Sequence, residues 1–118
     1  MKILICDDSK SVHTMFKMFV GKNDYQIDSA YNACELISQF QAKQSYDVIF
    51  LDWEMPEING LEALHFLKRS GCQIPIIMLT GKNSESNIDQ AFKAGAKNYL
   101  MKPFTEDLIQ GALEDLRS

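Results

Sequence analysis

The sequence predicts a single α/β domain: a (βα)5 doubly wound parallel sheet with strand order 2-1-3-4-5. Short apolar runs rich in branched residues alternate with segments whose apolar residues follow the helical period. The alternation extends through all 118 residues without an internal repeat, low-complexity tract or linker. Strict strand–helix alternation implies a parallel sheet covered by helices on both faces. Five strand–helix units in this length favour the open sheet over a closed barrel, which would need about 250 residues.

Three apolar runs are continuous, as expected for strands whose two faces are both covered. They lie at residues 3–6, 48–51 and 74–79. Two weaker strand candidates lie at residues 26–30 and 98–101. We expect these five segments to form the sheet.

Between the predicted strands, apolar residues recur three and four positions apart, which indicates helices with one buried face. Gly21 is expected to end the first helix, and Gly71 and Gly95 lie where the third and fourth should end. The five apolar stripes are, in chain order, Val12, Met15, Phe16, Phe19 and Val20; Ala33, Ile37 and Phe40; Leu61, Leu64 and Leu67; Ile88, Ala91 and Phe92; and Leu108, Ile109, Ala112, Leu113 and Leu116.

Composition and charge exclude several classes of protein. The hydrophobic fraction of 46% and the charged fraction of 24% are those of an ordinary globular domain. The net charge is −4 and no Lys/Arg run stands out, so we expect no direct binding of nucleic acid or membrane surface. Three scattered cysteines, Cys6, Cys34 and Cys72, indicate reduced thiols and a cytoplasmic location. The sequence shows neither a signal peptide nor an apolar stretch of about 20 residues.

Polar residues follow four of the predicted strands. Asp7 and Asp8 follow the first strand, Asp52 the third, Thr80 the fourth and Lys102 the fifth. Each alone has an ordinary explanation in turn chemistry. However, the carboxyl ends of parallel strands share one edge of the sheet, where ligands bind. The convergence of five such residues at that edge therefore predicts a functional site.

The residue types at this edge indicate phosphoryl chemistry with a metal ion. Three clustered carboxylates repel one another unless a cation compensates. Mg²⁺ fits best, because it binds through one or two carboxylates and keeps several waters. Lys102 would keep a neighbouring carboxylate ionised, and an ionised aspartate between these charges can attack a phosphoryl donor. Thr80 is expected to hydrogen-bond the phosphoryl group.

Four segments resemble the signature blocks of response-regulator receiver domains, the CheY-like family of two-component signalling. They are residues 3–9 (ILICDDS), 48–60 (VIFLDWEMPEING), 76–81 (IIMLTG) and 94–104 (AGAKNYLMKPF). The DxxMPxxxG block with a downstream Lys-Pro is the most specific part. The resemblance implies the flavodoxin-like and CheY-like fold and one receiver domain over residues 1–118, with any effector domain outside this chain.

The resemblance also implies a role for each acidic residue. Asp52 would be the phosphoacceptor, modified by a phospho-histidine on a sensor histidine kinase or a histidine phosphotransfer protein. Asp8 and Asp52 would bind Mg²⁺ directly and Asp7 through water. The backbone carbonyl of Glu54 would supply a further metal ligand.

For the remaining residues the resemblance implies a switch. Thr80 and Lys102 would contact the phosphoryl group, and the peptide bond before Pro103 would be cis. Thr80 would then move toward the phosphoryl oxygens and Tyr99 would rotate inward. This remodels the face made by the fourth helix, fifth strand and fifth helix, which would control an output partner or a fused effector domain. The alternative for Tyr99 is a half-buried strand aromatic without a switching role.

The same resemblance implies that the protein is not an enzyme and catalyses only its own phosphorylation and slow dephosphorylation. It would be a monomer or a weak, phosphorylation-dependent dimer. Nothing after the fifth helix indicates an output domain, so a stand-alone regulator and a piece of a longer regulator both remain open.

Three residues near the site lead to further expectations. Glu54 and Lys82 could pair across the pocket mouth and prolong the phosphorylated state; alternatively both are solvated and the pair contributes about 0–1 kcal/mol. His13 is expected to point to solvent without a catalytic role.

Three alternatives to a functional receiver fit the sequence less well. A small aspartyl-phosphate phosphatase of the haloacid-dehalogenase type carries a second aspartate two residues after its nucleophile, where this chain has Glu54. A nucleotide-binding module would need glycines in the turn at residues 6–11, and there are none. A degenerate receiver is disfavoured because all five pocket residues are present.

Overall fold

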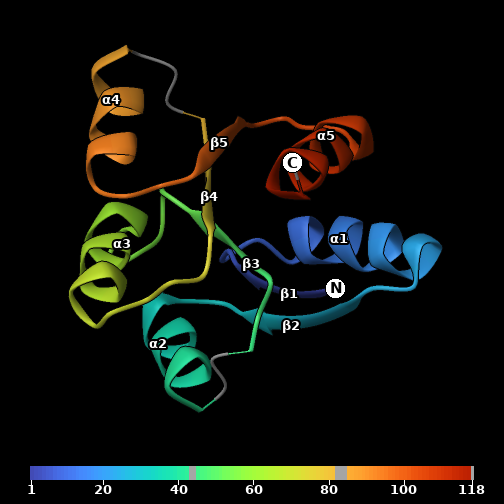
Figure 1. Cartoon of the computed structure of the whole chain (residues 1–118), viewed down its shortest axis with the longest axis horizontal. Coiled ribbons are helices and arrows are strands. Elements are labelled where there is room, and N and C mark those ends of the chain that lie inside the picture. The colour runs from blue at the N-terminus through green and yellow to red at the C-terminus, as the bar shows by residue number, and fades with distance from the viewer. Residues whose placement is uncertain (43–44, 82–84, 118) are drawn as a thin grey trace.

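The computed structural model describes residues 1–42, 45–81 and 85–117, which alternate between strand and helix (Figure 1). The strands are β1 (Lys2–Cys6), β2 (Gln26–Ala30), β3 (Val48–Asp52), β4 (Ile76–Thr80) and β5 (Asn98–Met101). The helices are α1 (Lys10–Asn23), α2 (Ala33–Ala42), α3 (Gly60–Arg69), α4 (Glu85–Lys93) and α5 (Glu106–Arg117). Within the described residues, no helix has the length and apolar character needed to cross a bilayer.

The sheet has the order β2-β1-β3-β4-β5 with every pair parallel, which confirms the predicted fold class. The chain turns to one side of β1 to form β2 and to the other side to form β3, so a topological switch point lies between β1 and β3. Cys6 pairs with Leu51 across these two strands. The residues that follow, Asp7 and Asp52, are therefore level with each other at the carboxyl edge.

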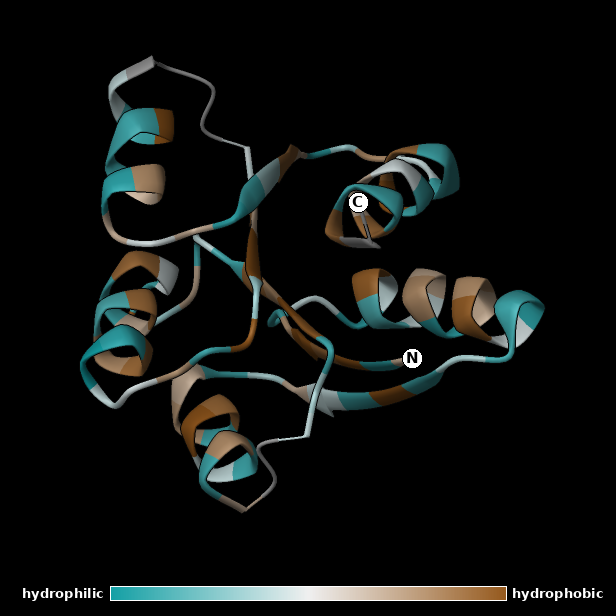
Figure 2. Ribbon diagram, in the orientation of Figure 1, coloured by the Kyte–Doolittle hydropathy of each residue, from teal (hydrophilic) through white to brown (hydrophobic). Residues whose placement is uncertain are grey.

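The two faces of the sheet are covered by different helices, and each face has its own core. Helices α1 and α5 lie on one side and α2, α3 and α4 on the other (Figure 1). Strand residues alternate between the cores: Ile3 and Ile5 face α1 and α5, whereas Leu4 and Cys6 face the other layer. Figure 2 shows this as apolar strands at the centre and helices whose outer sides are polar. The buried inner strands therefore place their last residues along the same edge of the sheet.

Helix ends agree with the sequence at two positions and differ at one. Gly71 (φ 85°) and Gly95 (φ 109°) follow α3 and α4 in the left-handed conformation, as predicted. The expectation that Gly21 ends the first helix is wrong, because α1 continues to Asn23. Asp24 takes the left-handed conformation instead (φ 57°), and its N–H donates to the carbonyl of Val20. Aspartate tolerates this conformation better than most residues do.

The apolar stripes also need correction. Phe92 and Leu108 are 44% and 48% exposed, although both were expected on buried faces. Successive helical residues are about 100° apart, so Ile109 faces the core and its neighbour Leu108 does not. Strand β4 begins at Ile76 rather than at residue 74, because the proline before it has no N–H to add to the ladder.

The glycine that closes the DxxMPxxxG block is fixed by a close approach. The first residue of α3, Gly60, donates its N–H to the carbonyl of Trp53 at 2.8 Å. A Cβ at Gly60 would lie 2.1 Å from the carbonyl oxygen of Asp52 and 2.7 Å from the Cα of Trp53. Both are backbone atoms, which cannot move aside as the end of a flexible side chain could. This glycine therefore lets α3 pack directly against the end of β3.

We expect Gly60→Ala to lower the free energy of unfolding by about 2 kcal/mol or more, because backbone must move to accept the methyl group. Gly21→Ala is the matched control. No atom lies within 4 Å of a Cβ at Gly21, which is inside α1, so alanine there should stabilise by about 0.5–1 kcal/mol. Urea denaturation measures both; equal midpoints for Gly60→Ala and wild type would contradict the packing argument.

Candidate functional site

Three carboxylates gather at the carboxyl edge of β1 and β3. Asp7, Asp8 and Asp52 each present an oxygen within 4.8 Å of the others. Asp7 is 0% exposed and Asp52 1% exposed, whereas Asp8 lies at the surface. The sheet therefore buries two acidic side chains and leaves the third open to solvent.

Lys102 bridges the two buried carboxylates. Its Nζ lies 2.9 Å from Oδ2 of Asp7 and 2.9 Å from Oδ1 of Asp52. Its backbone N–H donates to the carbonyl of Thr80 at 2.8 Å, which fixes the chain just after β5. The bond between Lys102 and Pro103 is cis, as the resemblance implied. The site therefore contains one ammonium group and three carboxylates.

The charges at the site shift the acidities of its members. The pKa of Asp52 is raised to about 7: burial is the largest cause, the charges of Asp7 and Glu54 add to it, and the contact with Lys102 opposes it. Burial opposes the charge of Lys102, but its pKa is nevertheless raised, because it contacts both Asp7 and Asp52. Burial and the charges of Asp52 and Asp7 raise the pKa of the Cys6 thiol, so that cysteine stays protonated. The site is short of positive charge.

Oδ2 of Asp52 is buried and has no hydrogen-bond partner among the described residues. A buried carboxylate oxygen without a partner is costly, so its presence indicates a ligand. The cluster offers only hard oxygen donors, and Asp8 borders solvent. This donor set fits Mg²⁺, which binds few carboxylates and keeps several waters.

Thr80, at the end of β4, is already engaged. It is buried, and its hydroxyl donates to Oε1 of Glu54 at 3.1 Å. The sequence suggested that Glu54 pairs with Lys82, which lies outside the described residues. The contact between Thr80 and Glu54 had no signal in the sequence, since it depends on a side-chain rotamer in the loop after β3.

The expectation that His13 points to solvent is wrong, because its side chain is 1% exposed. The ring lies under Tyr31, with centroids 4.2 Å apart, and bonds to the loop that carries Asp7. A signal was available: His13 precedes Phe16 by three residues and Val20 by seven, and both are buried in the same stripe. If the buried stripe is counted from Val12 instead, His13 falls outside it.

Two aromatic residues flank the site. Trp53 directly follows Asp52, is buried, and donates its N–H to the carbonyl of Leu79 at 2.8 Å. Tyr99 on β5 is half-buried and packs edge-on against Phe92 of α4, with centroids 6.0 Å apart. Tyr99 thus joins the two elements whose remodelling was expected, while its switching role stays a prediction.

The chain matches the family model described as "Response regulator receiver domain" over residues 3–114. Chemotaxis protein CheY1 of Helicobacter pylori is 32% identical over 117 residues, which is 97% of this chain and 94% of that protein. Transcriptional regulatory protein ResD of Bacillus subtilis is 38% identical over 104 residues. That match covers 88% of this chain but 42% of ResD, so the chain spans about two fifths of that relative.

Solved structures give the same result. The receiver domain of Francisella response regulator 1452 superposes with a TM-score of 0.91 at 30% identity, covering 98% of this chain and 94% of that one. Vibrio cholerae chemotaxis protein CheY4 superposes with a TM-score of 0.90 at 27% identity, covering 98% and 97%. With the family match, the shared strand order and the convergent polar edge, these similarities show that the chain belongs to the response-regulator receiver domains of two-component signalling.

Proposed function

We propose that this chain is a phosphorylation-dependent switch whose phosphoacceptor is Asp52. The observation that carries the proposal is the buried, unpartnered Oδ2 of Asp52, beside two further carboxylates and the ammonium of Lys102. The donor would be a phospho-histidine on a sensor histidine kinase or histidine phosphotransfer protein. The proposed location is the cytoplasm, where such partners present their phosphohistidine.

Each residue of the site has a part in the transfer. A carboxylate oxygen of Asp52 forms a bond to phosphorus as the phosphorus–nitrogen bond breaks, and the departing imidazole takes up a proton. Asp8, Asp52, the Glu54 carbonyl and, through water, Asp7 would hold Mg²⁺, which supplies positive charge at the phosphoryl oxygens. Lys102 favours the ionised form of Asp52 and then neutralises the phosphoryl charge.

The switch begins when the hydroxyl of Thr80 breaks its hydrogen bond to Glu54. Its hydroxyl now donates to Glu54, and phosphorylation would offer stronger acceptors on Asp52. Thr80 turns toward those oxygens, and Tyr99 rotates toward the space left behind. Because Tyr99 packs on Phe92, the face made by α4, β5 and α5 changes shape and controls an output partner or a fused effector domain.

The proposal also covers assembly and activity. The chain would act as one receiver domain, as a monomer or a weak dimer that forms on phosphorylation. It would catalyse only its own phosphorylation and slow dephosphorylation. The family match gives no support to a haloacid-dehalogenase-type phosphatase.

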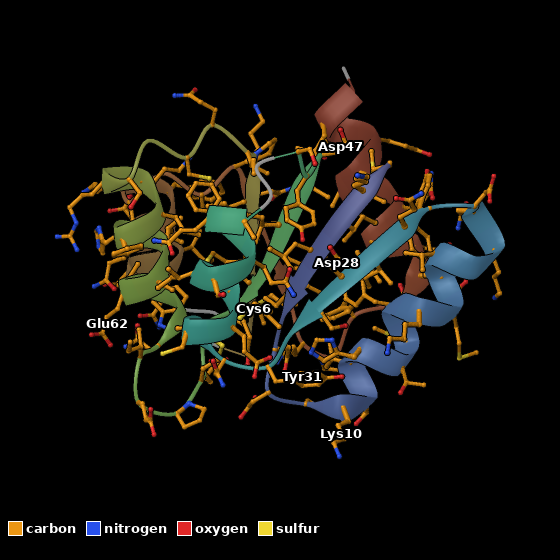
Figure 3. All side chains as sticks on the ribbon, turned by 90° about the horizontal axis from the view of Figure 1, so that it is seen from below. Cys6, Lys10, Asp28, Tyr31, Asp47 and Glu62 are labelled. Carbon is orange, nitrogen blue, oxygen red and sulfur yellow. The ribbon has the colours of Figure 1, made fainter. Side chains whose placement is uncertain are left out.

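Treatment with acetyl phosphate and Mg²⁺ should add one phosphoryl group to the wild type and none to Asp52→Ala. Mass spectrometry of the intact protein measures this. Asp47→Ala is the matched control, since Asp47 lies before β3 at the opposite end of the sheet from Tyr31 (Figure 3). Equal labelling of Asp52→Ala and Asp47→Ala would overturn the assignment of the phosphoacceptor.

Removing the charge of Asp52 should stabilise the metal-free protein in a pH-dependent way. Because the folded state raises the pKa of Asp52 to about 7, it binds more protons than the unfolded state between about pH 4 and 7. Wild type should therefore lose stability relative to Asp52→Asn as pH rises through this range. Above about pH 8 the difference should level off at about 4 kcal/mol or less, because each pKa unit corresponds to about 1.4 kcal/mol. Denaturation in EDTA measures it, and parallel pH profiles would contradict the shift.

Glu54→Gln should be phosphorylated by acetyl phosphate about three to ten times faster than wild type. The substitution removes a negative charge near the incoming phosphoryl group. It also weakens the hydrogen bond that holds the Thr80 hydroxyl away from the phosphoryl oxygens. Lys82→Ala should not share this gain in rate. If Glu54 and Lys82 also pair to prolong the phosphorylated state, both variants should shorten its half-life equally. A Glu54→Gln rate equal to wild type would exclude competition for Thr80, and unchanged half-lives would exclude the pair.

A further inference from the structure

The buried imidazole of His13 joins α1 to the loop after β1 and to the end of β2. Its Nε2 lies 2.7 Å from the backbone carbonyl oxygen of Asp7, and its Nδ1 lies 2.9 Å from the hydroxyl of Ser29. The side chain touches neither Asp52 nor Lys102 by any contact among the described residues. It therefore acts on the site only through the main chain of Asp7.

The hydrogen bonds fix which ring nitrogen carries the proton. A carbonyl oxygen only accepts, so Nε2 is the donor to Asp7, and in the neutral ring Nδ1 accepts from the hydroxyl of Ser29. Tyr31 covers the ring at an interplanar angle of 31°. Figure 3 shows Tyr31 where the strands end, beside the start of α1 that carries Lys10. The imidazole is therefore held on three sides, in one tautomer.

Each polar atom of Asp7 makes a contact; that of Oδ2 is an ion pair and not a hydrogen bond. Its N–H donates to the carbonyl of Ala30 at 3.1 Å, and its Oδ1 accepts from the N–H of Ser9 at 2.8 Å. Its Oδ2 pairs with Lys102. The carbonyl is the remaining group, and the bond from His13 holds it.

Asp8, by contrast, makes no hydrogen bond or ion pair to the described residues through its exposed carboxylate. The carbonyl of Asp7 and the nitrogen of Asp8 belong to one planar peptide unit. Fixing that carbonyl therefore fixes the direction in which the chain enters Asp8. The place of the Asp8 carboxylate within 4.8 Å of the other two depends on this peptide plane.

We infer that His13 is a positioning residue for the Mg²⁺ site: its Nε2–H orients the peptide between Asp7 and Asp8, and so aims the carboxylate of Asp8. The inference rests on the proposed function, since it concerns the same metal site. Without the donor, the buried carbonyl of Asp7 rotates toward another partner and carries Asp8 away from Asp52.

Two substitutions of His13 test the inference, and both introduce an amide side chain of similar polarity. In His13→Gln the amide nitrogen reaches the place of Nε2 and can still donate to Asp7, whereas in His13→Asn it reaches only the place of Nδ1. Calorimetric titration with MgCl₂ should show affinity weakened about tenfold or more by His13→Asn and retained within about threefold by His13→Gln. Unfolding in EDTA gives the stability of each variant without metal.

Tyr46→Phe is the control for stability alone. It removes only the hydroxyl of the buried Tyr46 side chain, which donates to Asp28 away from the metal site, so it should lower stability and leave Mg²⁺ affinity unchanged. Wild-type affinity in His13→Asn, or equal weakening in both His13 variants, overturns the inference. Failure of the wild type itself to bind Mg²⁺ overturns the proposed function instead, so the two failures are distinguishable.

Discussion

The ion pairs of Lys102 with Asp7 and Asp52 are the interaction on which the rest of the site depends. Two buried carboxylates side by side would be untenable without a cation, because leaving a buried charge unpaired costs about 3–5 kcal/mol. One ammonium at 2.9 Å from both makes their burial possible, yet it does not balance three negative charges. Burial, together with the charges of Asp7 and Glu54, raises the pKa of Asp52 to about 7 even though Lys102 opposes the rise. A site with this charge balance favours a ligand that brings further positive charge, which is the physical reason for proposing Mg²⁺ there.

The surrounding structure holds the backbones of Asp52, Lys102 and Asp7 from three different directions. Gly60 lets α3 pack against the carbonyl of Asp52, which restrains the backbone of Asp52 on that side. The carbonyl of Thr80 fixes the backbone of Lys102. His13 reaches from α1 to the carbonyl of Asp7. These contacts come from three layers of the fold, and none uses a carboxylate of the cluster, which leaves the reactive oxygens for ligands.

The fold and the gathering of the site residues were predictable because both depend on coarse features. A continuous apolar run remains a buried strand even when its first residue is misjudged, as at Ile76, and the residue after it reaches the same edge. Details set by helix rotation or by a rotamer were not predictable in the same way. One residue along a helix turns the side chain by about 100°, which is why His13 was placed in solvent and Leu108 in the core. The bond from Thr80 to Glu54 depends on torsions that no spacing encodes.

Both groups that the proposed mechanism brings to the phosphoryl oxygens are bound to carboxylates before phosphorylation. Lys102 is held by Asp7 and Asp52, and Thr80 donates to Glu54. Phosphorylation would therefore exchange partners rather than create bonds from free groups. The net free energy of such an exchange is the small difference between two sets of charge-assisted contacts, each contributing about 1.5–3 kcal/mol. A small difference keeps the two conformations close in energy, which is the condition under which one covalent change can shift the population from one to the other.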